Sequence, residues 1–156
     1  MRPEILAPAG DVKKLKTAFH FGANSVYVGL KRHSLRNFAR NFDLDELEFA
    51  LNHAHSRGGK VYVALNLIPY DEDLDEMVAD VRKLCQLQPD GLIVADPGVL
   101  ALVRREAPSL PVHLSTQANV TNAESARFWF AQGIERIVVA RELGIERLKQ
   151  LVANVP

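Results

Sequence analysis

Short β-branched apolar runs alternate with longer amphipathic segments along the whole chain. The short runs have the length and composition of buried strands, and each is followed by a segment with apolar residues at helical spacing. After the third run, Leu74, Val78, Val81, Leu84 and Cys85 share one helical face, which places Cys85 in the core. The pattern therefore predicts six strand–helix units. The expected strands are residues 4–7, 25–29, 60–66, 91–96, 112–115 and 136–140.

The ends of the predicted helices carry the residue types that helix termini prefer. An acidic or amide side chain precedes each of several helical segments, where it can accept hydrogen bonds from free backbone N–H groups. Asp43 followed by Glu46 fits a capping box. Glycines follow three helical segments, at the position that favours a left-handed backbone. The expected N-caps are Asp11, Asp43, Asp71 and Asn122, and the glycines are Gly22, Gly58 and Gly133.

Strand–helix alternation predicts a parallel α/β sheet with right-handed crossovers, which leaves two architectures. The length of 156 residues favours an open doubly wound sheet, because a complete (β/α)₈ barrel needs roughly 250 residues. However, neither end of the strand series has the polar sequence of an edge strand. No Gly-x-Gly-x-x-Gly or P-loop pattern follows a strand either. We therefore expect a TIM-like (β/α) barrel that is incomplete, with about six units.

Composition narrows the functional classes. The 19 basic residues balance the 19 acidic ones, so attraction to nucleic acid or to a membrane would have to be local. Cys85 is the lone cysteine, which excludes a disulfide framework or a cysteine-based metal site within this chain. The sequence shows no signal-peptide pattern and no long apolar run, so we expect a cytoplasmic protein that does not interact with membranes.

Each predicted strand ends in glycine or in polar residues, and the run Ser115-Thr-Gln-Ala-Asn119 is the most polar of these ends. In a barrel the carboxyl ends of the strands form one face, which carries the active site. Alternation turns His113, Ser115 and Gln117 toward the barrel axis, and Asn66 likewise. Solvated loops with helix caps, and a buried structural histidine, are the competing interpretations. The candidate substrate-binding residues are Asp11, Lys31, Arg36, Asn41, Asn66, Asp96, His113, Ser115, Gln117, Asn119, Arg141 and Glu142.

Two further features carry candidate chemistry. Residues 31–42 interleave four Lys or Arg side chains with two phenylalanines, a pattern that suits an anionic, ring-containing ligand or, equally, a solvated loop. Asp11, Asp96 and Glu142 form a weak candidate set for paired-carboxylate hydrolysis. There is no Gly-x-Ser-x-Gly nucleophile elbow, so the catalytic residues remain unassigned.

Six stretches across nearly the whole chain form an ordered set of motifs: residues 4–11, 22–29, 36–42, 95–100, 113–119 and 139–143. Together they resemble the collagenase-like peptidases of family U32. The resemblance implies a barrel fold. Despite the family name, several branches act in hydroxylation: of tRNA wobble uridine with prephenate, of ribosomal RNA, or in oxygen-independent ubiquinone synthesis. Other members are described as collagenases.

The resemblance implies that residues 1–156 are the N-terminal barrel portion of a longer enzyme, most similar to a tRNA wobble-uridine hydroxylation protein. A collagenase-like protease and a ubiquinone-pathway partner are the alternatives. The hydroxylating branches imply an iron–sulfur cluster held by cysteines after the sixth unit, which this chain lacks. We therefore expect no cofactor or metal in this chain, RNA as the partner of the longer protein, and little activity alone. Open sheet edges at the first and sixth strands also predict self-association.

Overall fold

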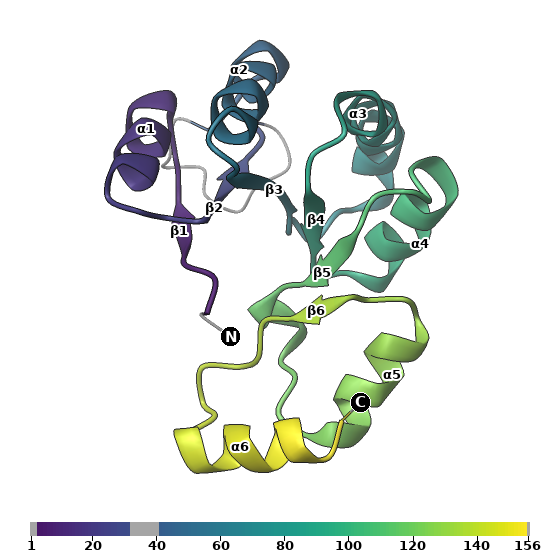
Figure 1. The fold of residues 1–156 in the computed structure, drawn as a ribbon. Coiled ribbons are helices and arrows are strands. Elements are labelled where there is room, and N and C mark those ends of the chain that lie inside the picture. Colours follow the sequence, from purple (N-terminus) through teal and green to yellow (C-terminus); the bar gives the residue numbers. More distant parts are fainter. Residues whose placement is uncertain (1–2, 32–40, 156) are drawn as a thin grey trace.

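The computed structural model describes residues 3–31 and 41–155. Six parallel strands pair in the order in which they occur along the chain and curl into a half-barrel (Figure 1). A doubly wound sheet would reverse its strand order at a switch point. The sequential order therefore confirms the incomplete barrel over the open sheet. The strands are β1 Leu6–Pro8, β2 Ser25–Gly29, β3 Lys60–Leu65, β4 Gly91–Val94, β5 Val112–Leu114 and β6 Arg136–Ile137.

Helices lie around the outside of the curled sheet (Figure 1). In the described part of the chain, none of them is both long enough and apolar enough to cross a membrane. Two short 3₁₀ helices, η1 Asp71–Asp73 and η2 Thr116–Ala118, interrupt the connections. The α-helices are α1 Val12–His20, α2 Leu44–His55, α3 Leu74–Leu87, α4 Pro97–Glu106, α5 Ala123–Ala131 and α6 Ile145–Ala153.

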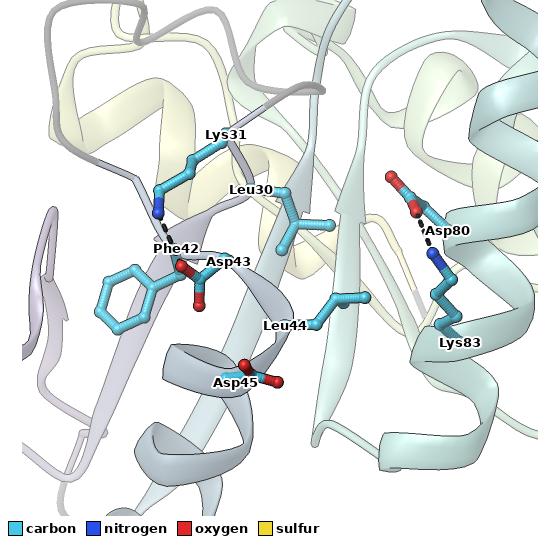
Figure 2. A pocket seen from close by; sticks show the side chains of 8 residues that line it. All are labelled: Leu30, Lys31, Phe42, Asp43, Leu44, Asp45, Asp80 and Lys83. Atoms are coloured by element: carbon cyan, nitrogen blue, oxygen red, sulfur yellow. Dashed lines mark hydrogen bonds and ion pairs between the residues drawn. The ribbon is translucent and has the colours of Figure 1, made fainter.

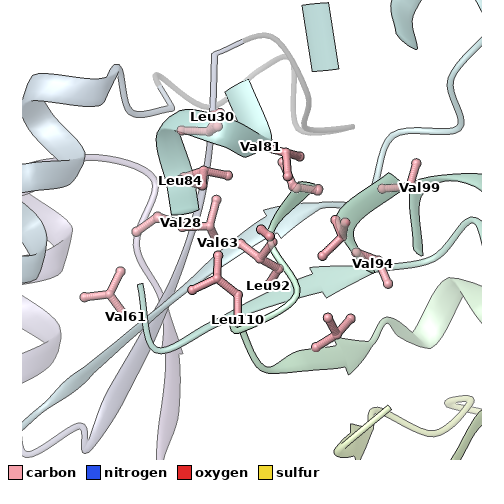
Figure 3. Close-up of a cluster of buried hydrophobic side chains, with 14 of the residues drawn as sticks. Val28, Leu30, Val61, Val63, Val81, Leu84, Leu92, Val94, Val99 and Leu110 are labelled. Carbon is pink, nitrogen blue, oxygen red and sulfur yellow. The ribbon is translucent and has the colours of Figure 1, made fainter. Parts of the chain in front are cut away.

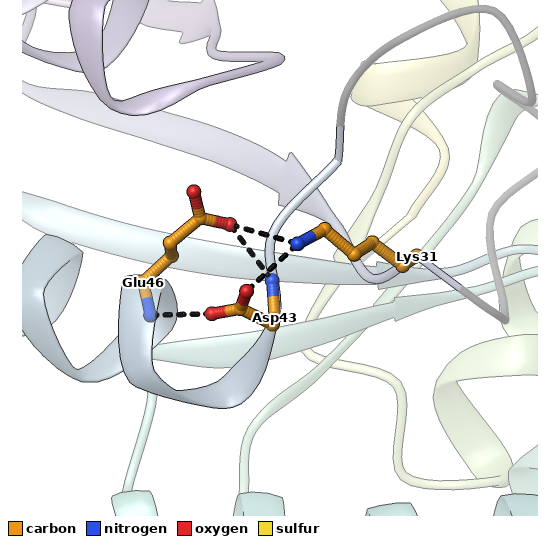
Figure 4. A network of polar contacts seen from close by, with 3 residues as sticks. All are labelled: Lys31, Asp43 and Glu46. Atoms are coloured by element: carbon orange, nitrogen blue, oxygen red, sulfur yellow. Dashed lines mark hydrogen bonds and ion pairs between the residues drawn. The ribbon is translucent and has the colours of Figure 1, made fainter.

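The helix-end predictions hold with one exception. The capping box is present, because the Glu46 N–H donates to Asp43 Oδ1 at 2.8 Å and the Asp43 N–H donates to Glu46 Oε2 at 3.1 Å (Figure 4). Asp71, however, is not the N-cap of α3. It begins η1, and α3 follows with Asp73 as its N-cap residue. Confirmed as predicted are the N-caps Asp11 and Asn122 and the left-handed Gly22, Gly58 and Gly133.

Several strands are shorter than predicted, because neighbouring loops take their hydrogen bonds. The Ile5 N–H donates to the side chain of Asn24 at 2.9 Å, so β1 begins only after it. At the other end of the sheet, the Ala140 N–H donates to the Val120 carbonyl at 3.1 Å, in the loop after β5. The chain after β6 therefore hydrogen-bonds to the loop after β5 instead of extending the strand.

The hydrophobic core lies between the sheet and the outer helices (Figure 3). Val28 and Val63 on neighbouring strands, and Val81 and Leu84 of α3, are completely buried in it. Cys85 packs against the same core, as the spacing of apolar residues predicts. Because side chains alternate along a strand, the residues between these core positions point to the inside of the curl. Polar groups gather on that inner face.

Candidate functional site

A hollow of about 390 Å³ lies inside the curl at the carboxyl ends of the strands. Residues from all six strands or their following loops line it, from Leu6 of β1 to Val138 after β6. This is the face at which barrel folds place their binding sites. We call it the rim hollow. Its polar lining residues are Tyr27, Asn41, Asn66, Ser115, Thr116, Gln117 and Arg141.

A small amide network joins the third and fifth strand ends within the rim hollow. Asn66 Nδ2 donates to Gln117 Oε1 at 2.8 Å, and Ser115 Oγ donates to the same oxygen at 3.2 Å. Both lone pairs of the Gln117 carbonyl oxygen are thus occupied. The hydrogen-bonding group that Gln117 keeps for a ligand is its amide nitrogen, which is a donor.

Asn66 carries a hydrogen-bond acceptor beside the Gln117 donor. Its Oδ1 is buried and has no hydrogen-bond partner among the residues that the structure describes. A buried acceptor without a donor costs about 1–3 kcal/mol, so a ligand that donates a hydrogen bond here would remove that cost. The wall of the rim hollow therefore holds one unmet acceptor, Asn66 Oδ1, close to one donor group, the Gln117 amide nitrogen. Because Oδ1 is buried, the Asn66 side chain has to move for a ligand to reach it.

The loops that frame the rim hollow are held by local hydrogen bonds. Thr116 Oγ1 donates to the Val139 carbonyl at 3.1 Å, which ties the loop after β5 to the chain after β6. Asn119 ends η2 with a left-handed backbone (φ +53°). Asn41 is buried and also left-handed (φ +46°). Asparagine tolerates this conformation better than other non-glycine residues, which accounts for the amide side chain at both positions.

A second polar group, which we call the deeper group, lies on the inner face below the rim hollow, toward the amino ends of the strands. Its Tyr62 and His113 are buried, whereas its Glu4 and Arg136 are exposed. Glu4 accepts hydrogen bonds from Tyr62 Oη at 3.0 Å and from the Arg136 guanidinium at 2.9 Å. Glu4 precedes β1 and Arg136 belongs to β6, so this ion pair bridges the two edges of the half-barrel, 132 residues apart in sequence. The His113 ring packs on Tyr62 with 4.7 Å between ring centroids.

The deeper group has shifted pKa values. Burial alone would raise the pKa of Glu4, but hydrogen bonds from Ser25, Arg136 and Tyr62, together with the charge of Arg136, lower it to about 2. Burial and the hydrogen bond to Glu4 raise the pKa of Tyr62 to about 12. Burial, assisted by the Arg136 charge, lowers the pKa of His113 to about 4. His113 is therefore a neutral, buried packing residue at neutral pH, and it does not line the rim hollow.

The candidate carboxylates do not form a reactive pair. Asp11 accepts the Lys14 N–H at 2.8 Å and Asp96 accepts the Val99 N–H at 3.0 Å, so each carboxylate caps its own helix. Glu142 is exposed and, like Asp11 and Asp96, does not line the rim hollow.

Lys31 also lies away from the rim hollow. Its Nζ sits 2.7 Å from Asp43 Oδ2 and 3.4 Å from Glu46 Oε2 (Figure 4), and the hydrogen bond to Asp43 raises the pKa of Lys31. A separate hollow of about 460 Å³ extends from there to α3, where Lys83 pairs with Asp80 (Figure 2). Its lysines are thus matched by carboxylates. Arg36, and most of the 31–42 stretch, lie outside the described residues.

Metal ions and iron–sulfur clusters each require a particular set of side-chain ligands. Within residues 3–31 and 41–155, no three His, Cys, Asp or Glu side chains come together as metal ligands. Iron–sulfur clusters are held mainly by cysteine thiolates, usually four. Cys85, the single cysteine, packs on the core face of α3. This chain therefore cannot supply the ligands of such a cluster by itself.

The sequence reasoning missed several residues of the inner face. Tyr27 and Ile93 line the rim hollow, and Glu4 and Arg136 form the ion pair beneath it. Strand alternation could have predicted that three of these four residues face inward. Tyr27, Ile93 and Arg136 are register partners of the inward residues Tyr62, Ala64 and His113, respectively.

Two curated bacterial proteins match almost the whole chain in sequence. tRNA hydroxylation protein P of Escherichia coli (strain K12) is 39% identical over 155 residues, which are 99% of this chain and 34% of that protein. The protein of the same name from Helicobacter pylori (strain J99) is 41% identical over 154 residues, 98% of this chain and 36% of that protein. The chain thus spans about a third of the length of these relatives.

A solved structure described as a U32 peptidase has the same fold. It superposes with a TM-score of 0.79 over 99% of this chain and 66% of the other, at 20% sequence identity. The family model for peptidase family U32 matches residues 10–156. This match agrees with the six ordered motifs and with the half-barrel that they build. The chain belongs to peptidase family U32.

Proposed function

We propose that this chain is the substrate-binding half-barrel of an RNA hydroxylation protein that acts on the wobble uridine of tRNA. The observation that carries the proposal is the 39–41% identity, over nearly the entire chain, to tRNA hydroxylation proteins of two bacteria. The chemistry of the rim hollow supports the same assignment, because its polar groups suit a nucleobase.

A uracil ring matches the groups that the rim hollow leaves available. After a movement of the Asn66 side chain that exposes its buried Oδ1, the ring N–H would donate to this oxygen. A flanking ring carbonyl would accept from the amide nitrogen of Gln117. The side chains of Tyr27 and Ile93 supply apolar contact for the ring. Ligand pockets commonly measure about 300–1,000 Å³ with a few placed polar groups, and the hollow of about 390 Å³ lies within that range.

Arg141 gives the rim hollow a cation. It is exposed and lines the hollow just after β6. An arginine guanidinium binds phosphate or carboxylate groups through paired hydrogen bonds. We assign Arg141 to the phosphate of the bound nucleotide or to a carboxylate of prephenate, the co-substrate implied for this branch of the family.

The redox step of hydroxylation requires groups beyond this chain. An iron–sulfur cluster would supply electron transfer, and its cysteine ligands would have to lie in the longer protein outside residues 1–156. The role left to this chain is to bind and orient the base. Because tRNA is its proposed substrate, the protein would act in the cytoplasm.

Mass spectrometry of tRNA nucleosides tests the proposal. Deletion of the gene is expected to abolish wobble-uridine hydroxylation, and the full-length gene to restore it. Full-length Asn66→Ala and Gln117→Ala variants are expected to restore at most about a tenth of it, since each removes a hydrogen bond worth about 1.5 kcal/mol to the base. Gln150→Ala, on the exposed face of α6, is the matched control and should restore it fully. Unchanged hydroxylation in the deletion strain would refute the proposal.

Two other outcomes would redirect the assignment. Gelatin digestion by the full-length protein, abolished by Asp96→Ala, would support a collagenase-like protease. The N-cap role of Asp96 argues against that result. A quinone defect on deletion, with co-purification of a second family member, would support the ubiquinone-pathway alternative.

A further inference from the structure

A group of cationic and aromatic side chains lies on the outside of the half-barrel, where the C-terminal halves of α1 and α2 meet. It surrounds a shallow hollow of about 440 Å³. Although the whole chain has no net charge, α1 carries three lysines and a terminal histidine and no acidic residue. We call this group the α1–α2 patch. Its members are Lys16, His20, Phe21, Phe49, His53 and Arg57.

The side chains of the patch are ordered against one another. The Lys16 ammonium lies 5.0 Å from the centroid of the Phe49 ring. Phe49 stacks on His53 with 5.7 Å between centroids and 26° between the ring planes. Arg57 Nη1 lies 3.3 Å from His53 Nδ1 and donates to the His53 carbonyl at 3.1 Å. Lys16 thus lies over the Phe49 ring, and Arg57 contacts the edge of the stacked His53 ring.

The patch is locally positive. Burial first, and then the charges of Arg57 and Lys16, lower the pKa of His53, and no carboxylate opposes that shift. Among the described residues, neither Lys16 nor Arg57 forms an ion pair with a carboxylate, whereas Lys31 and Lys83 do. The positive charge of the patch is therefore available to an anionic partner.

An exposed aromatic ring stands beside these cations. Phe21, directly after α1, is 82% exposed and makes an edge contact with the His20 ring at 5.2 Å between centroids. Cations that no carboxylate of the described chain pairs with, next to an exposed aromatic ring, are the two elements of sequence-tolerant binding of single-stranded nucleic acid.

We propose that the α1–α2 patch is a second RNA-binding surface, in which Lys16 and Arg57 contact backbone phosphates and Phe21 stacks on an unpaired base. The proposal rests on RNA being the substrate class, as in the proposed function. Helix α1 runs back from the rim hollow toward the amino ends of the strands, so the patch is separate from the base-binding site. Phosphate contacts at such a distance fix the register of an RNA without reading its sequence.

Fluorescence polarisation with labelled unmodified tRNA tests the proposal on this 156-residue chain. The double variant Lys16→Gln/Arg57→Gln removes two cations of the patch. It is expected to weaken binding about tenfold at 150 mM salt and to reduce the slope of log affinity against log salt by about 1.5, since two phosphate contacts are lost. Arg147→Gln/Lys149→Gln on α6 removes the same charge elsewhere and should change affinity less than twofold.

A second variant separates stacking from charge and guards against misfolding. Phe21→Ala alters a ring that is 82% exposed, so the fold should persist. It is expected to weaken binding about tenfold with an unchanged salt slope, because loss of base stacking is not electrostatic. Circular dichroism verifies that each variant is folded.

Four results would overturn the proposal. The first three are no RNA binding by the unmodified chain, equal losses in the α1–α2 and α6 double variants, and unchanged binding in the α1–α2 double variant. The fourth is equally tight binding of polyglutamate, which would indicate an acidic protein partner. These failures are distinct from failure of the proposed function. Hydroxylation that persists after gene deletion refutes the proposed function but leaves RNA binding by the patch measurable. Unchanged RNA binding in the double variant refutes the patch alone.

Discussion

Mild acid should destabilise this fold through one buried histidine. His113 is 6% exposed and packs on Tyr62 inside the curl. Its pKa in the folded chain is about 4, against an ordinary value of 6.5. Between these two values the unfolded chain binds a proton that the folded chain does not. The contribution of His113 to the free energy of unfolding is therefore at its full value above pH 6.5 and falls as the pH is lowered toward 4.

The size of the effect follows from the two pKa values. At pH 5.5 the unfolded histidine is largely protonated, whereas the folded one is almost entirely neutral. For His113 alone, the linkage relation then gives a loss of about 1.4 kcal/mol in the free energy of unfolding relative to pH 7.5. Most carboxylates remain ionised at pH 5.5 in both states, so they contribute little to this difference.

Urea unfolding measures this pH-dependent loss of stability. The fluorescence of Trp129, which is the single tryptophan and is buried, reports on unfolding. The unmodified chain and the variant His113→Phe are compared at pH 7.5 and pH 5.5. Phenylalanine keeps a ring on Tyr62 but cannot titrate. The pH-dependent loss should therefore be about 1.4 kcal/mol smaller in the variant, whatever its absolute stability. His20→Gln, at an exposed position, is the matched control and should behave like the unmodified chain.

Equal pH dependence in the unmodified chain and in His113→Phe would refute the reasoning. It would mean that His113 takes up its proton in the folded chain as readily as in the unfolded one. The inner face of the half-barrel would then be more hydrated than its packing indicates.

Three further predictions concern stability and assembly. Asp43→Ala removes one half of the capping box and is expected to cost about 1 kcal/mol by urea unfolding, whereas Asp45→Ala, the exposed neighbour, should cost less. Leu84→Ala opens a cavity in the completely buried core and is expected to cost about 3 kcal/mol in the same assay. Among the described residues, β1 and β6 each pair with one strand only, which leaves two open sheet edges. Analytical sedimentation at rising protein concentration should therefore show self-association. A monomer at every concentration would contradict this expectation.

The sequence by itself determined the elements and their inward faces. Apolar periodicity identified all six strands, and the positions of Asp43 and Glu46 identified a capping box, because both depend on residues close together in the chain. Alternation also predicted that Asn66, Ser115 and Gln117 face the inside of the curl, and all three line the rim hollow. Asn66 and Ser115, however, directly follow their strands, and Gln117 belongs to η2, so strand alternation alone does not explain where Gln117 lies. These three residues now share one amide network in the rim hollow.

Only the tertiary structure decided which polar residues meet. Asp11 and Asp96 were candidate site residues, but each caps its own helix. Lys31 was a candidate too, but it forms an ion pair with Asp43 of the same strand–helix unit. Conversely, Glu4 and Arg136 form an ion pair across 132 residues that no local pattern indicates. The curvature of the sheet brings β6 back toward β1, and that long-range geometry depends on the packing of all six units together.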